Sequence, residues 1–89
     1  MAKFALNIYG ENDKVVKTYA TDIIRYGVIE DTVSLLNEIE GKSNVEQFKL
    51  VKPLIKSIFS GLTDEEIKNA DYIEVMGVFN QLVQEAVKN

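Results

Sequence analysis

The chain has 89 residues, a formal net charge of −4, and neither cysteine nor histidine. This length fits one domain spanning residues 1–89, and the missing residue types exclude disulfides, thiolate or histidine metal sites and histidine-dependent catalysis. The acidic balance argues against nucleic-acid binding as the main role, because such binding normally needs a basic surface. We also see no signal peptide and no apolar run of membrane-spanning length.

The N-terminal part of the chain predicts a β-hairpin. Residues from about 3 to 9 alternate in the two-residue period of a strand. The side chains on its apolar face are Phe4, Leu6 and Ile8. A polar run over 10–13 is rich in turn formers, and the β-branched and aromatic run over about 15–20 predicts the second strand.

One pairing sets the expected register of this hairpin. If Tyr9 lies opposite Val15, then Ile8 lies opposite Val16 and one face of the hairpin is apolar. A two-stranded ribbon is marginally stable by itself, so we expect helices against that face. Tyr9 and Tyr19 combine apolar area with a polar tip, which suits a partner interface, although a core position is about equally consistent with each.

The first helix is expected over about 23–40, with Thr21 or Asp22 as its N-cap. Its apolar stripe has helical spacing and consists of Ile24, Val28, Thr32, Leu35, Leu36 and Ile39. Gly27 lies in the first turns, and a close packing contact with the hairpin is the favoured explanation for a glycine there. Gly41 is expected to end the helix.

The second helix is expected over about 44–59, where Ser43 and Glu46 have the spacing of a capping box. Its predicted stripe is Phe48, Val51, Ile55, Ile58 and Phe59, widened by Leu50 and Leu54. Pro53 lies inside this pattern, and a proline there removes one backbone donor and clashes with the preceding turn. We therefore predict a kink or a break near residues 51–52.

A sharp corner is predicted after the second helix. Gly61 is placed to take a positive φ at the helix end, and Thr63 with Glu66 forms a capping box for a short helix over about 63–69. This first turn is strongly acidic. A metal site would need converging carboxylates, so a favourable interaction with the helix dipole is the preferred explanation for Asp64, Glu65 and Glu66.

The last helix is expected over about 72–87, with Asp71 as N-cap and Glu74 three residues later. Its predicted core stripe is Tyr72, Val75, Met76, Phe79, Leu82, Val83 and Ala86. Further apolar residues fall outside this stripe, namely Ile73, Val78 and Val87. Hairpin and helices together predict an α+β fold that is mostly helical.

A lysine stripe runs along the second helix at i, i+3 and i+7 and consists of Lys49, Lys52 and Lys56. It suits an acidic partner or phosphate, although a solvated helix face is the commoner explanation. The acidic residues of the first helix, Glu30, Asp31 and Glu38, are candidates to pair with it. No phosphate-binding loop or nucleophile motif is present, so we expect no cofactor and no enzyme activity.

Several segments, in order, resemble the tail assembly chaperones of tailed bacteriophages and prophages. They lie at residues 3–10, 17–19, 46–50, 58–66 and 70–72. The resemblance implies a non-enzymatic assembly factor of the bacterial host cytoplasm that binds the tape measure protein while tail tube subunits polymerise around it. It implies no catalytic residues, no cofactor and no membrane, and it names the tail tube protein as a further partner.

We place the expected partner groove beside the last helix, because that helix carries more apolar surface than one stripe explains. The candidate contacts are Ile73, Val78, Phe79 and Val87 on this helix, Tyr9 and Tyr19 on the hairpin, and Lys49, Lys52 and Lys56 on the second helix. The open edges of the hairpin offer a second contact or a self-association edge, which would make a homo-oligomer. Two alternatives stay open: a structural tail or connector component retained in the virion, and a small DNA-binding regulator.

Overall fold

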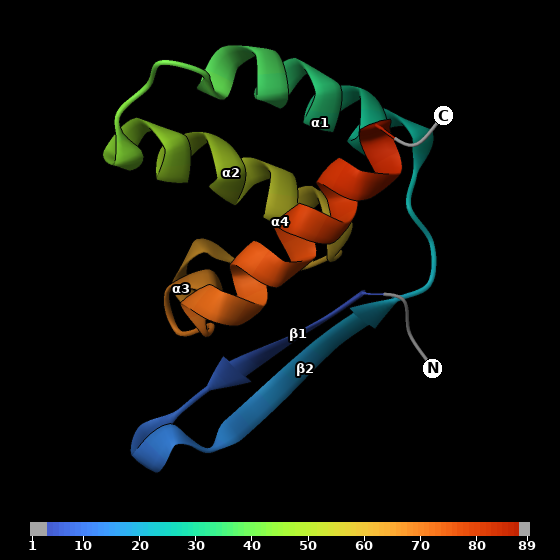
Figure 1. The fold of residues 1–89 in the computed structure, drawn as a ribbon. Helices are drawn as coiled ribbons and strands as arrows, with labels where there is room; N and C mark the ends of the chain where they lie inside the picture. Colours follow the sequence, from blue (N-terminus) through green and yellow to red (C-terminus); the bar gives the residue numbers. More distant parts are fainter. Residues whose placement is uncertain (1–3, 88–89) are drawn as a thin grey trace.

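The computed structural model describes residues 4–87 and contains a hairpin followed by four helices (Figure 1). The elements are β1 (Phe4–Tyr9), a 3₁₀ turn (Glu11–Asp13), β2 (Val15–Thr21), α1 (Tyr26–Ile39), α2 (Asn44–Ile58), α3 (Asp64–Lys68) and α4 (Tyr72–Val87). This confirms the predicted α+β, mostly helical fold. The bounds agree closely except at α1, which begins later than expected.

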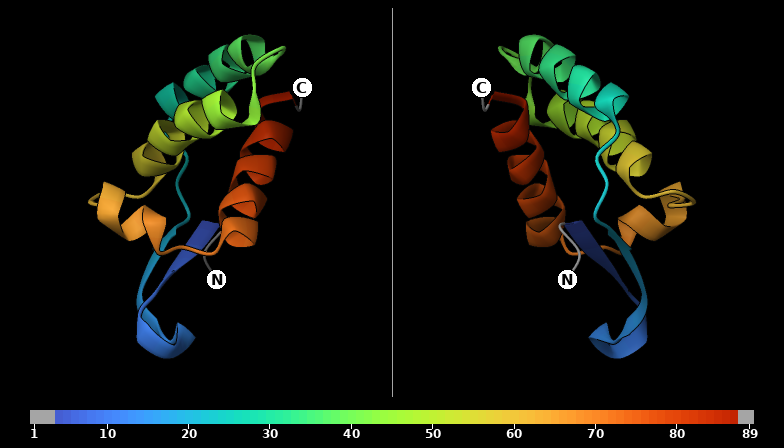
Figure 2. Two further views of the ribbon diagram at one scale, coloured as in Figure 1. Left: turned by 90° about the vertical axis from the view of Figure 1, so that its left-hand side faces the viewer. Right: turned by 90° about the vertical axis from the view of Figure 1, so that its right-hand side faces the viewer.

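The helices lie on one side of the hairpin. α1 and α2 run side by side, and α4 lies opposite this pair. The hairpin lies below all three helices (Figure 2). β1 faces the helices, since its buried side chains Phe4, Leu6 and Ile8 alternate with more exposed ones. The remaining buried apolar residues are Val28, Leu35, Val51, Leu54, Ile55, Phe59, Leu62, Val78, Phe79 and Leu82.

The hairpin register differs from the expectation by one residue. Tyr9 does lie opposite Val15, but Ile8 pairs with Lys17, because a bulge leaves Val16 without a partner residue on β1. Val16 is 67% exposed, so the extra residue turns it to solvent. As a result Tyr19, which pairs with Leu6, lies on the face that meets the helices.

The start of α1 was predicted wrongly. Its N-cap is Arg25, which makes no side-chain cap, and the Thr21 hydroxyl instead accepts a hydrogen bond from Ile23 N–H at 3.1 Å. This local turn uses the residue that was expected to cap the helix. Gly27 is exposed, and a Cβ added there would meet nothing within 4 Å, so the predicted close contact with the hairpin is wrong.

α2 continues through Pro53 from Asn44 to Ile58, so the helix does not break there, and a kink at this position stays a prediction. Pro53 is exposed, while Val51, Leu54 and Ile55 are buried on both sides of it. A single lost donor does not interrupt a helix whose apolar face is held by packing. The Ser43 cap is confirmed, because its Oγ accepts a hydrogen bond from Glu46 N–H at 3.3 Å.

The predicted corner between α2 and α3 is confirmed. Gly61 has a φ of +87°, and Thr63 and Glu66 form both hydrogen bonds of the capping box. Glu66 also accepts hydrogen bonds from the Tyr19 hydroxyl at 2.5 Å and from Lys17 Nζ at 3.2 Å. The corner is therefore tied to β2 through one carboxylate.

The hydrogen bond from Tyr19, with that from the Thr63 backbone, lowers the pKa of Glu66 from 4.5 to about 2. As the pH falls, the Glu66 carboxylate therefore becomes protonated at a higher pH in the unfolded chain than in the folded protein. The stability that Glu66 contributes is present above about pH 5 and is lost progressively as the pH falls toward 2.

Glu66→Gln is accordingly expected to lose less stability on acidification than the unchanged protein. Urea unfolding at neutral pH and at about pH 3 measures this difference. Exposed Glu65 is the matched control, and Glu65→Gln should follow the unchanged protein. An equal acid loss in Glu66→Gln and the unchanged protein would contradict this role of Glu66.

The start of α4 departs from the predicted capping box. Asp71 does cap it, since its Oδ1 accepts a hydrogen bond from Ile73 N–H at 2.9 Å. Glu74, however, reaches β1, where Oε1 accepts from Asn7 N–H at 3.1 Å and Oε2 accepts from the Tyr9 hydroxyl at 2.5 Å. This contact raises the pKa of Tyr9, because the carboxylate stabilises the protonated phenol. A second carboxylate thus ties the hairpin to the helices.

Candidate partner-binding groove

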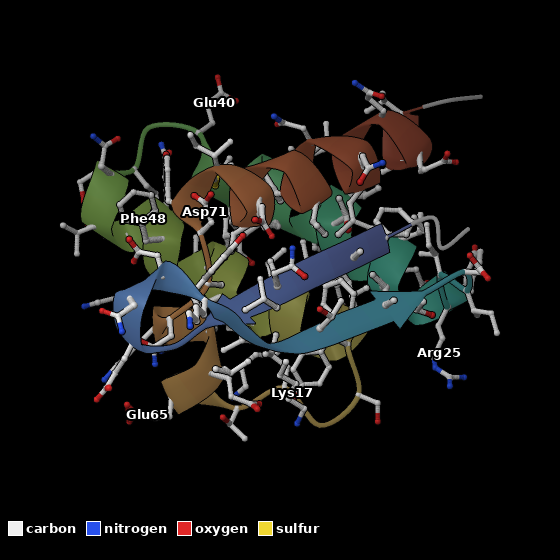
Figure 3. All side chains as sticks on the ribbon, turned by 90° about the horizontal axis from the view of Figure 1, so that it is seen from below. Lys17, Arg25, Glu40, Phe48, Glu65 and Asp71 are labelled. Carbon is white, nitrogen blue, oxygen red and sulfur yellow. The ribbon has the colours of Figure 1, made fainter. Side chains whose placement is uncertain are left out.

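Exposed aromatic side chains meet where α2 and α4 begin. Phe48 and Tyr72 are 51% and 59% exposed, and their ring centroids lie 5.8 Å apart in an edge-to-face arrangement. In Figure 3 the label Phe48 shows where α2 borders this region, and the label Asp71 shows the residue just before α4. Aromatic pairs left half-exposed provide a large apolar area that a partner can cover.

The aromatic pair borders a groove of about 420 Å³, which we call the α2–α4 groove. It is lined by Phe48, Val51, Lys52, Ile67, Lys68, Ala70, Tyr72, Val75 and Met76. Most of these side chains are apolar, and methionine adapts its shape readily to what it contacts. The groove can therefore take an apolar segment.

A second groove of about 440 Å³ adjoins the first and shares Lys52 with it; we call it the lysine groove. Its lining is Lys49, Lys52, Pro53, Lys56 and Asp64. Asp64 Oδ1 lies 2.7 Å from Lys56 Nζ and 3.8 Å from Lys52 Nζ. The hydrogen bond from Lys56 and the charge of Lys52 lower the pKa of Asp64.

This pairing corrects the expectation that acidic residues of α1 form ion pairs with the lysine stripe. None of its acidic residues Glu30, Asp31 and Glu38 pairs with these lysines within the described chain, and α3 supplies Asp64 instead. Lys49 makes no ion pair within the described residues. The stripe is therefore only partly neutralised.

The predicted contacts on α4 divide into two groups. Ile73 and Val87 are 76% and 68% exposed and remain available. Val78 and Phe79 are buried at 3% and 7%, so the expectation that Val78 lies outside the core stripe is wrong. α4 packs against both α1 and β1, which makes its buried face broader than one stripe.

Tyr9 and Tyr19 are half-buried, and their hydroxyls donate to Glu74 and Glu66. Both tyrosines therefore hold the hairpin to the helices, and their polar tips are already used. At the β1 edge, Tyr9 N–H also donates to Asn69 C=O at 2.9 Å, so that edge is partly closed. β2 is almost entirely exposed and, within the described residues, pairs only with β1.

Phe48 and Tyr72 were assigned to core stripes, and this was wrong. Both lie in the first turns of their helices, where the stripe extends beyond the elements that cover it. One feature of the sequence could have indicated this exposure. Both apolar stripes begin close to the capped end of their helix, and helix ends often extend beyond the core. The groove was nevertheless expected beside α4, and the α2–α4 groove borders its first turns.

Another hollow of about 350 Å³ lies between β2, the start of α1 and the end of α2, with Arg25 in its lining. Within residues 4–87, no three acidic side chains gather in a way that could hold a metal ion. None of the described helices is long and apolar enough to cross a membrane. The α2–α4 groove is the surface whose chemistry points most directly to a ligand.

Comparison with known proteins gives no relative for this chain. No family model matches it, and neither a curated protein nor a solved structure does.

Proposed function

We propose that the protein is a non-enzymatic binding module that takes an apolar helical segment of another polypeptide into the α2–α4 groove. The observation that carries this proposal is the exposed Phe48–Tyr72 pair on an apolar groove of about 420 Å³. Amphipathic helices bind such grooves through apolar anchors one turn apart. Aromatic residues at the centre of a contact commonly supply much of the binding energy.

The sequence resemblance suggests the partner. As a tail assembly chaperone, the protein would bind the tape measure protein in the bacterial host cytoplasm and keep that long helical chain covered until tail tube subunits polymerise. The groove fits this role, since a helical chain presents repeated apolar anchors. The exposed β2 edge is available for a further contact, with the tail tube protein or a second copy.

The direct test is a pull-down of the tape measure protein from the same genome. The double variant Phe48→Ser/Tyr72→Ser should bind about 30-fold or more weakly, because a central aromatic contributes about 2 kcal/mol. Tyr26 is the matched control, since it is 79% exposed on α1 and does not line the groove. Tyr26→Ser should therefore bind normally.

Equal binding by the folded double variant and the unchanged protein would contradict the groove proposal. Mass spectrometry of purified virions separates the chaperone from a retained tail or connector component. Presence at stoichiometric copy number would favour the retained component, whereas a chaperone is expected to be absent.

A further inference from the structure

We propose that the α2–α4 groove selects a partner helix that carries acidic residues along one flank of its apolar anchors. This inference rests on the proposed groove function and names the chemistry of the partner. It follows from the lysines around the groove and from what they pair with.

Positive charge gathers at the two adjoining grooves although the chain as a whole is acidic, with a net charge of −4. Lys52 and Lys68 line the α2–α4 groove, which has no carboxylate in its lining. Lys49 and Lys56 extend the positive region through the lysine groove, where Asp64 is the only acidic lining residue. The basic region thus borders the apolar one directly.

The internal neutralisation of these lysines is incomplete. Asp64 is close to Lys56, at 2.7 Å, and more distant from Lys52, at 3.8 Å. Within the described residues, neither Lys49 nor Lys68 has a carboxylate within ion-pair distance. Lys49 on α2 therefore has no ion pair, and Lys68 on α3 is attracted to Asp64 only from beyond ion-pair distance.

A helix seated on Phe48, Tyr72 and Met76 would bring one of its flanks to these lysines. Residues three or four positions apart lie on one side of a helix, so acidic residues at that spacing meet α2 and α3 together. Complementary charge of this kind adds specificity and speeds association more than it adds affinity. It also weakens with salt, because the lysines are partly exposed.

A polypeptide fits this surface better than a nucleic acid does. Nucleic-acid binding depends mainly on neutralising many phosphates, whereas this site joins a few lysines to an apolar groove. The half-exposed aromatic pair is already packed edge to face, which leaves a surface for apolar side chains. We therefore commit to an amphipathic helix with an acidic flank.

The experiment uses three synthetic helical peptides with one common apolar face and a flank of Glu, Gln or Lys. Titration of the whole protein should show the Glu peptide binding about tenfold more tightly than the Gln peptide, and the Lys peptide most weakly. Lys49→Glu/Lys68→Glu should weaken the Glu peptide about tenfold and strengthen the Lys peptide. Neither lysine takes part in a described ion pair, so the variant should stay folded, with a small loss of stability because the new carboxylate at position 68 lies one helical turn after Asp64.

The matched control is Lys14→Glu/Arg25→Glu, which changes the net charge equally at exposed positions away from both grooves and breaks no described ion pair. It should leave the peptide ranking unchanged. Equal binding of the three peptides, with Phe48→Ser/Tyr72→Ser abolishing it, would overturn the charge inference and keep the groove.

Binding of none of the three peptides would also overturn the inference, and the tape measure pull-down would then decide the proposed function separately. A DNA duplex that bound in their place, with the same sensitivity to Lys49→Glu/Lys68→Glu, would overturn it in favour of a nucleic-acid partner.

Discussion

Val78→Glu is expected to unfold the protein, whereas Ile73→Glu on the same helix should leave it folded. Val78 is 3% exposed and Ile73 is 76% exposed. An uncompensated charge in an apolar core costs several kcal/mol, and the packing of the valine is lost as well. A domain of this size has about 5–15 kcal/mol of stability in total, so the first change removes most of it.

Circular dichroism during thermal and urea unfolding measures both variants. A cooperative transition near that of the unchanged protein is expected for Ile73→Glu, and its absence or a large shift for Val78→Glu. A fully folded Val78→Glu would contradict the burial of this face of α4. Loss of partner binding in Val78→Glu would reflect the loss of the fold, so surface contacts on α4 are better tested at Ile73 or Val87.

Glu74→Ala is expected to destabilise the protein by about 1–3 kcal/mol, because two donors on β1 lose their acceptor. These donors are Asn7 N–H and the Tyr9 hydroxyl, at 3.1 and 2.5 Å from the carboxylate. Urea unfolding gives the free energy, and hydrogen exchange should show faster exchange at the Asn7 amide.

Glu30 on α1 is the matched control for Glu74, since it is exposed and makes no described ion pair. Glu30→Ala should change the stability by no more than about 0.5 kcal/mol. If Glu74→Ala had the same small effect and left the Asn7 amide protected, its carboxylate would not be what joins β1 to α4.

Features that depend on interactions between neighbouring residues were predicted correctly from the sequence. The Thr63–Glu66 capping box and the positive φ of Gly61 depend on hydrogen bonds and sterics within a few residues. The same is true of β1, whose alternation shows which of its faces is buried. The caps and the alternation of β1 follow from the sequence because neighbouring residues produce them, whereas the burial of one face of β1 also requires the helices that pack on it.

Side-chain partners at long range could not be predicted in this way. Glu66 and Glu74 both had the spacing of a capping box, but only Glu66 forms one, and Glu74 binds β1 instead. Which partner a carboxylate takes depends on the element that packs against its helix. The packing of the hairpin against α4 is what gives Glu74 its partners on β1.

The order and the type of the strands and helices could be predicted from the sequence, because apolar spacing and capping residues act over a few neighbouring positions. The packing of the elements against one another leaves Val78 buried and leaves Phe48 and Tyr72 exposed beside lysines of α2 and α3. Helical spacing shows which side chains share a face. It does not show how far neighbouring elements extend over that face, and this coverage separates a core residue from one that can contact a partner.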